Sequence, residues 1–342
     1  MEIPHKLNPP ARCAAGGALA LAASLTILLA NGACGAPQAR SAEAEPAPPA
    51  PAAPAAADAT TSAPTTQPAA SADDALATAP KPAFLWQIEG PNGPSYLFGT
   101  MHGGVHPDKD LPAAVWERFE GASIVVVEAD VRAAITAMSG DTTQLMLPAG
   151  ETLEQKLSAD EWQRLVAYMA DTLPELLLKR FKPSSVVSMM TTKALPSTPS
   201  IDMTIIARAQ EAKKEMVYLE DWRAQMALFD DIVKIDTLRY ILDDLEQFER
   251  DSAEMVAIYT SGDEDRLAEF MRDPARYPSG TDEATLERLL FERNRSWIAE
   301  LEKQINRGGA FIAVGAGHLA GTDSVNQLLA ARGFTITRLA SP

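Results

Sequence analysis

Two kinds of hydrophobic pattern alternate along residues 83–342. Short, nearly continuous apolar runs such as Ile124–Val127 are typical of strands buried on both faces of a sheet. Apolar residues at intervals of three and four, as in residues 201–211, indicate helices with one apolar face. We therefore predict an α/β fold, in which a mixed β-sheet has helical cover and a large central helical insertion at about residues 150–300.

The expected sheet begins with a β-hairpin and ends with a β-α-β unit. Residues 84–88 and 95–100 have the pattern of two strands, and the segment 90–94 between them is rich in Gly and Pro, as tight turns are. The other predicted strands cover residues 124–128, 216–219, 311–314 and 334–339.

The predicted helices carry start signals in their sequences. Ser158 is followed three residues later by Glu161, which is the pattern of a capping box, and Pro183 suits the first turn of another helix. The other predicted helices cover residues 111–119, 201–211, about 222–260, 263–272, 281–306 and 325–332.

The N-terminal part of the chain differs in composition from the rest. Residues 13–30 are apolar and uncharged, follow a short segment with two basic residues, and precede small residues, as in a secretory signal peptide. We therefore predict a secretory or lipoprotein signal at residues 1–34. Residues 35–82 are dominated by Ala, Pro, Ser and Thr, which indicates a disordered linker. Residues 83–342 are expected to form the folded α/β domain.

The sequence around Cys34 is compatible with two forms of export. A cysteine behind small residues suggests a lipoprotein signal, whereas Asn31, three positions before it, is atypical of such signals. Lipidation of Cys34 would attach the domain to a membrane as a periplasmic, outer-membrane or cell-surface lipoprotein. Cleavage by an ordinary signal peptidase would instead give a soluble exported protein.

Charge, cysteine content and missing motifs exclude several classes of partner, metal ligand and reaction. The formal net charge of −16 argues against a nucleic-acid partner, which requires a basic face. Both cysteines, Cys13 and Cys34, precede the folded domain, so a metal there must use histidine and carboxylate ligands. The sequence contains neither a Gly-x-Ser-x-Gly elbow nor a phosphate-binding loop, which argues against serine hydrolase and nucleotide-dependent chemistry.

Two stretches with the same pattern carry the candidate chemistry. Each is a strand-like run that ends in Gly-x-x-His, and their histidines, His102 and His318, are two of only four in the chain. Glycine lets the backbone turn sharply off a strand and leaves room beside it for a ligand. The structural part of the two motifs consists of Gly99, Thr100, Gly315 and Gly317.

Two carboxylates, like the two histidines, follow the ends of predicted strands. Glu128 and Glu220 also come at the ends of predicted strands, and ligands of α/β sheets bind at the carboxyl ends of strands. Two imidazoles and one carboxylate are a common ligand set for a divalent metal that keeps an open position. We therefore predict His102, His318 and Glu128 as metal ligands and catalytic residues.

Other polar residues are candidates for the same site. Arg293 and Asn294 lie on the helix before the second motif, where they could orient a carboxylate or stabilise an oxyanion, and we count them as catalytic. Glu220 and Gln225 are expected to bind substrate, although Glu220 could instead belong to a helix cap. His106 lies on a loop after the first motif and is expected to be a loop residue or an accessory ligand on the substrate side.

The domain contains, in this order, the segments LFGTMH, VVVEAD, LEDWRAQMALFD, ERNRSW and AVGAGHLAG. Their order and spacing resemble those of the TraB/GumN family, which includes the Tiki-type metalloproteases and is distantly similar to erythromycin esterases and haem-binding ChaN proteins. The resemblance covers about residues 84–340. It implies an α/β fold with two site histidines and one glutamate, and a divalent metal, with manganese or cobalt favoured in the animal members and zinc a further alternative. The chain departs from the family at residues 321–324, where the usual glycine-rich stretch is Gly-Thr-Asp-Ser.

The expected function is that of an exported, metal-dependent hydrolase that acts on a peptide or a small molecule. Two alternatives remain open. The same fold could serve a non-catalytic protein that binds a peptide signal or haem, or a metal-independent esterase in which histidine and glutamate carry out the hydrolysis.

Overall fold

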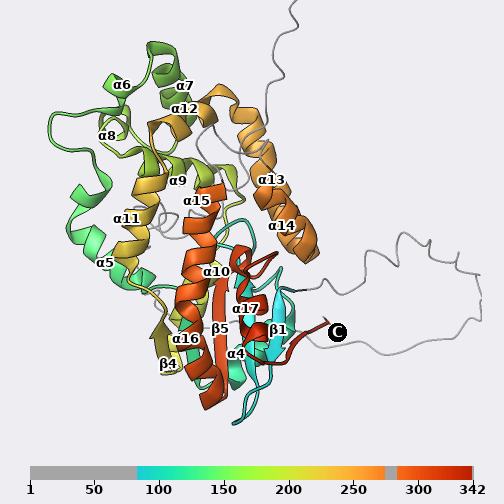
Figure 1. The fold of residues 1–342 in the computed structure, drawn as a ribbon. Helices are drawn as coiled ribbons and strands as arrows, with labels where there is room; N and C mark the ends of the chain where they lie inside the picture. The colour runs from blue at the N-terminus through green and yellow to red at the C-terminus, as the bar shows by residue number, and fades with distance from the viewer. Residues whose placement is uncertain (1–82, 274–282, 341–342) are drawn as a thin grey trace, which may run out of the picture. The chain divides into compact units, whose positions relative to one another are not determined.

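The computed structural model describes residues 83–273 and 283–340. The predicted signal peptide, the linker and Cys34 lie outside the described residues. The described residues form a six-stranded sheet with helices packed around it, which confirms the predicted α/β fold (Figure 1). No helix in these two described ranges is long and apolar enough to cross a membrane.

The strands lie close to their predicted positions. They are β1 (Leu85–Ile88), β2 (Ser95–Thr100), β3 (Ile124–Val127), β4 (Glu215–Tyr218), β5 (Ala310–Gly315) and β6 (Ile336–Arg338). Their order in the sheet is β4-β3-β5-β2-β1-β6. The strands β4, β3, β5 and β2 run parallel, whereas β1 is antiparallel to both of its neighbours. The carboxyl ends of four strands therefore lie at one edge of the sheet.

The helices of the first half of the domain precede β3 or lie between β3 and β4. They are α4 (Ala113–Gly121), α5 (Val131–Gly140), α6 (Leu153–Lys156), α7 (Ala159–Met169), α8 (Glu175–Leu178), α9 (Pro183–Ala194) and α10 (Ile201–Glu211), with a 3-10 turn η1 (Thr142–Leu145) after α5. The capping box of Ser158 and Glu161 has both of its hydrogen bonds, and Pro183 occupies the first turn of α9. These two start signals are therefore confirmed.

The remaining helices lie between β4 and β5 or follow β5. They are α11 (Trp222–Ile232), α12 (Ile235–Asp243), α13 (Leu245–Ser261), α14 (Glu264–Arg272), α15 (Glu283–Leu286), α16 (Glu292–Arg307) and α17 (Val325–Ala331), with a π-helical turn η3 (Glu287–Phe291) before α16 and a 3-10 turn η4 (Ala316–His318) after β5. The helical stretch expected at about 222–260 is thus divided into three helices. Asp244 begins the third, because its carboxylate accepts a hydrogen bond from the backbone of Gln247.

Two hydrophobic cores stabilise the domain. The first surrounds the sheet, where the ring centroid of Phe311 lies 5.9 Å from that of Phe98 and 5.6 Å from that of Phe119. The second lies within the helical insertion, among helices that Figure 1 shows gathered away from the sheet, and it includes Trp162 and Phe248. The sheet that carries the candidate residues is therefore packed on its own core.

We expect the substitution Phe98→Ala to lower the free energy of unfolding by about 3–5 kcal/mol, because it opens a cavity in the core of the sheet. Urea denaturation monitored by circular dichroism measures this loss. Leu176→Ala is the matched control, because Leu176 on α8 is 70% exposed and its loss should change the free energy by no more than about 0.5 kcal/mol. Equal effects of the two substitutions would contradict the described core.

Candidate active site

The two Gly-x-x-His motifs lie side by side in the sheet. In the parallel pairing of β2 with β5, Gly99 is opposite Val314 and Thr100 is opposite Gly315. A Cβ atom on Gly99 would lie 2.8 Å from Cβ of Phe84 and 3.1 Å from Ala316, so only glycine fits at this contact between the motifs. Segments far apart in the chain are thereby held in register by backbone hydrogen bonds.

Three predicted residues converge on Gly315. The point where a Cβ atom would lie on Gly315 is 3.3 Å from Oε1 of Glu128, 3.6 Å from Cδ2 of His318 and 3.8 Å from Nε2 of His102. The three residues are only 8%, 4% and 7% exposed, respectively. The absence of a side chain at position 315 therefore leaves the space in which these three groups face one another.

Glu128 is a buried carboxylate that receives three hydrogen bonds. Its Oε1 accepts from the backbone N–H of Gly315 at 2.7 Å, and its Oε2 accepts from Nη2 of Arg293 at 2.6 Å and from Nε2 of Gln225 at 3.0 Å. Burial alone would raise the pKa of Glu128, but His318, Arg293 and the other nearby donors lower it to about 2. Glu128 is therefore ionised at neutral pH.

Arg293 links the two strand-end glutamates. Its Nε donates to Oε2 of Glu220 at 3.1 Å, while its Nη2 donates to Glu128. Burial would lower the pKa of Arg293, but the two carboxylates raise it. Burial also raises the pKa of Glu220, an effect that Arg293 opposes. Gln225 donates to both carboxylates, 3.0 Å from Oε1 of Glu220.

The π-helical turn η3 positions this arginine. In a π turn the α-helical hydrogen bonds are interrupted, and such turns are frequent at functional sites. Nη1 of Arg293 donates to the carbonyl of Leu289 within η3 at 2.8 Å, and also to Nε2 of His318 at 3.2 Å. The guanidinium carbon lies 4.9 Å from the ring centroid of Trp297, one turn further along α16.

Each histidine is held through its Nδ1 atom. Nδ1 of His102 is 2.7 Å from Oδ2 of Asp202, and Nδ1 of His318 is 2.6 Å from Oδ1 of Asn294. Both partners are acceptors, which assigns a proton to each Nδ1 and leaves Nε2 facing the other site residues. The amide of Asn294 donates in turn to the carbonyl of Asp323 at 2.8 Å, in the loop where the chain departs from the family pattern.

The two imidazoles have opposite pKa shifts. For His318, burial together with the charge of Arg293 lowers the pKa from 6.5 to about 3, although Glu128 opposes the shift. For His102, burial also lowers the pKa, but the Asp202 carboxylate outweighs it and the pKa is raised. His318 is therefore a neutral imidazole at pH 7, whereas His102 gains a proton more readily than a free histidine does.

Asp202 is the site residue that the sequence analysis missed. Its Oδ2 accepts from His102, and its Oδ1 accepts from the hydroxyl of Thr100 at 2.7 Å. Ser200 caps α10 just before it, so Asp202 has the pattern of an ordinary acidic residue in a first helical turn. Nothing in the sequence pattern distinguishes it, because its partner lies far away in the chain. Thr100, which was predicted only as a motif residue, is the second side chain that contacts Asp202.

His106 lies in its own loop rather than against the three convergent residues. Its backbone N–H donates to Oδ2 of Asp110 at 2.8 Å, and its Nδ1 accepts from the backbone of Asp108 at 3.2 Å. Gly317 lies in the 3-10 turn η4 that leads to His318. The structure thus brings together the predicted histidines, glutamates, arginine, asparagine and glutamine, and directs the described contacts of His106 elsewhere.

In the described part of the chain, no group of three or more His, Cys, Asp or Glu side chains meets the geometry of a metal site. Nε2 of His318 lies 3.7 Å from Oε1 of Glu128, and the Arg293 guanidinium contacts both residues. A positive charge is therefore already held between the second histidine and the glutamate.

A model of the TraB/PrgY/gumN family matches residues 84–338. The chain belongs to this family. It is 24% identical to the uncharacterized protein YbaP of Shigella flexneri over 249 residues, covering 70% of this chain and 88% of that protein. YbaP of Escherichia coli K12 is also 24% identical, over 68% of this chain and 87% of its own length.

A more distant relative has a name that states an activity. The metalloprotease TIKI2 of Danio rerio is 23% identical over 317 residues, which cover 74% of this chain and 60% of that protein. No solved structure shows a significant match to the chain. The family and this relative are consistent with a hydrolase.

The depressed pKa of His318 predicts a pH-dependent stability. The unfolded chain takes up a proton at this residue near pH 6.5, whereas the folded chain does so only near pH 3. The stability contributed by the neutral imidazole is therefore lost as the pH falls from 6.5 towards 3. Urea denaturation should show that the free energy of unfolding falls less between pH 6.5 and 5 in His318→Gln than in the wild type. Carboxylates contribute little to the change in this pH range. Parallel curves for the two proteins would refute the assignment.

A second prediction concerns the partner of His102. Removing the negative charge in Asp202→Asn should lower the pKa of His102, because the remaining burial favours the neutral imidazole. NMR titration of the ring resonances measures this pKa. The matched control is Asp108→Asn, which removes a carboxylate from the loop of His106 and should leave the titration of His102 unchanged.

Proposed function

We propose that the protein is a hydrolase that uses a divalent metal ion to cleave peptide bonds, with His102, Glu128 and His318 at its centre. The convergence of two anchored imidazoles and an ionised carboxylate on Gly315 is the observation that carries this proposal. Membership of the family and similarity to a protein named as a metalloprotease support the reaction class.

The chemistry of the donor set fits a divalent ion. Protonation of Nδ1 leaves the lone pair of Nε2 on His102 and on His318, and an acceptor on Nδ1–H is the usual arrangement behind a metal-bound histidine. These two nitrogens and the carboxylate of Glu128 would hold the ion, which would polarise a carbonyl and lower the pKa of its bound water. In the described structure the guanidinium of Arg293 donates to Nε2 of His318 and to Oε2 of Glu128, so a divalent ion would have to displace Arg293 from these two atoms.

The surrounding residues orient the reacting groups and keep their charges fixed. Asp202 and Asn294 hold the two imidazoles in the tautomer that carries its proton on Nδ1. Arg293 keeps Glu128 ionised, and its guanidinium is a suitable donor to an oxyanion that develops on the substrate carbonyl. Glu220 holds Arg293 from its other side. Burial of these groups strengthens each of the interactions.

One observation favours a second candidate, a metal-independent esterase. The pair formed by Nδ1 of His102 and Asp202 at 2.7 Å has the form of an imidazole general base oriented by a carboxylate. In that mechanism Nε2 of His102 removes a proton from water, and Arg293 stabilises the oxyanion. Hydrolysis that persists in the presence of a chelator would favour this candidate.

We also propose that the chain is exported and that Cys34 carries a lipid anchor. The apolar run at residues 13–30 and the linker at 35–82 support this proposal. Metabolic labelling with a radioactive fatty acid tests it, since Cys34→Ser should abolish the label. If the wild-type protein is exported without the label, Cys34 carries no lipid and the protein is exported in a soluble form.

We expect the purified domain to bind about one divalent ion and to lose it in His102→Ala, since one of three donors is removed. Elemental analysis by mass spectrometry measures the ion, and cleavage of a peptide library measures activity, which should fall at least a hundredfold in the variant. Glu246→Gln is the control, because it removes an exposed carboxylate on α13 and should change neither quantity. If the wild type binds no ion and His102→Ala cleaves as fast, the proposed function is wrong.

A further inference from the structure

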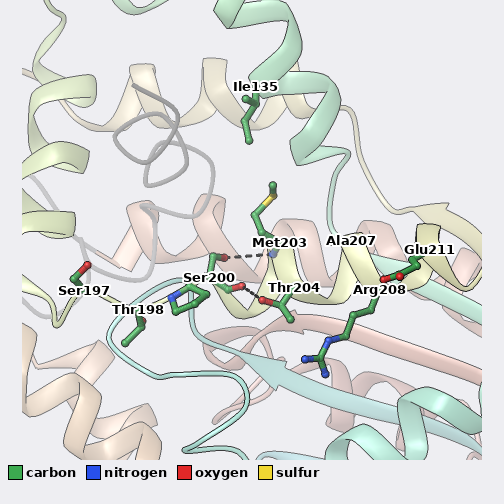
Figure 2. A pocket seen from close by; sticks show the side chains of 10 residues that line it. Ile135, Ser197, Thr198, Ser200, Met203, Thr204, Ala207, Arg208 and Glu211 are labelled. Atoms are coloured by element: carbon green, nitrogen blue, oxygen red, sulfur yellow. Dashed lines mark hydrogen bonds between the residues drawn. The ribbon is translucent and has the colours of Figure 1, made fainter. Parts of the chain in front are cut away.

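A cavity of about 730 Å³ lies between α10 and α5 (Figure 2). Its lining combines apolar side chains with small hydroxyl groups, and charged side chains lie at one end. It is lined by Ile135 of α5, by Ser197, Thr198, Pro199 and Ser200 before α10 and at its cap, and by Met203, Thr204, Ala207, Arg208 and Glu211 of α10.

The helices that line this cavity also line the space around His102. A small cavity of about 20 Å³ there is lined in part by Val131 of α5 and by Asp202 and Ile206 of α10. The larger cavity uses the next turn of α5, at Ile135, and the neighbouring face of α10. The same pair of helices thus borders both spaces, and α10 both holds His102 through Asp202 and forms the wall of the larger cavity.

The chemistry of the lining favours an apolar group. Ile135, Met203 and Ala207 supply apolar surface, and Figure 2 shows Met203 extending from α10 towards Ile135. The hydroxyl of Thr204 is already bonded to the carbonyl of Ser200 at 2.8 Å, so it presents mainly its methyl group. The charge of Arg208 is balanced by Asp108 at 2.5 Å.

We infer that this cavity is the subsite that receives an apolar side chain of the peptide substrate, next to the bond cleaved at His102. This inference rests on the proposed function. A methionine in the wall suits such a role, because its flexible side chain adapts to ligands of different shape. The cavity is larger than a single leucine or phenylalanine side chain, so it admits bulky groups and sets a preference by size.

Two substitutions should change this preference in opposite directions. Ala207→Leu fills part of the cavity from an exposed position, so the domain should fold as before, and the preference for Leu over Ala in the peptide should fall about tenfold. Ile135→Ala enlarges the cavity and should increase the retention of peptides that contain Trp. Ala253→Leu, at an exposed alanine of α13, is the matched control and should change nothing.

The experiment measures binding and cleavage separately. An immobilised library of acetylated octapeptides, varied one position at a time, is incubated with the full domain and with each variant, and retained peptides and cleaved peptides are both counted. A size preference that shifts in the two variants supports the subsite. Identical preferences in all proteins, or no retained peptide, would overturn it. Shifted binding without any cleavage would keep the subsite and reject the hydrolase.

Discussion

The candidate active site depends on one buried guanidinium. Arg293 is placed between Glu128 and Glu220, which come from neighbouring parallel strands, and without its positive charge two carboxylates would lie together in the protein interior. The cost of burying an unpaired charge is large, so this ion pair is a condition for the carboxyl edge of the sheet to close as it does. Because the same guanidinium contacts His318, the charges and the positions of the site residues are set together.

Much of the architecture could be predicted from the sequence, because it follows from local patterns. The apolar run Ile124–Val127 is a strand in which every residue is buried, and the Gly- and Pro-rich segment at 90–94 joins two antiparallel strands. Ligands of α/β sheets bind at the carboxyl ends of the strands, and this rule predicted that His102, Glu128 and His318 lie close together. In the structure the three residues surround Gly315. Composition and periodicity carry this information within short windows of sequence.

The remainder of the site depends on contacts that no local pattern encodes. Asp202 contacts His102, which lies 100 residues earlier in the sequence. The residues around Asp202 have the pattern of an ordinary helix N-terminus. The π-helical turn before α16 likewise has no clear signature, yet it supplies the carbonyl of Leu289 that holds Arg293. For His106 the sequence left a loop residue and an accessory ligand as alternatives, and the described contacts of its backbone N–H and Nδ1 lie within its own loop.

The position of β5 in the sheet has a consequence for how the candidate site forms during folding. This strand is formed near the end of the chain, but it lies between β3 and β2, which are formed near the beginning of the domain. During synthesis, about two hundred residues are added after β2 and β3 before β5, the strand that lies between them, is made. Pairing between strands so far apart in the sequence is slow. The insertion of β5 also delivers Gly315 and His318. Completion of the sheet and assembly of the candidate site are therefore a single event, and a chain that ends before β5 lacks both Gly315 and His318.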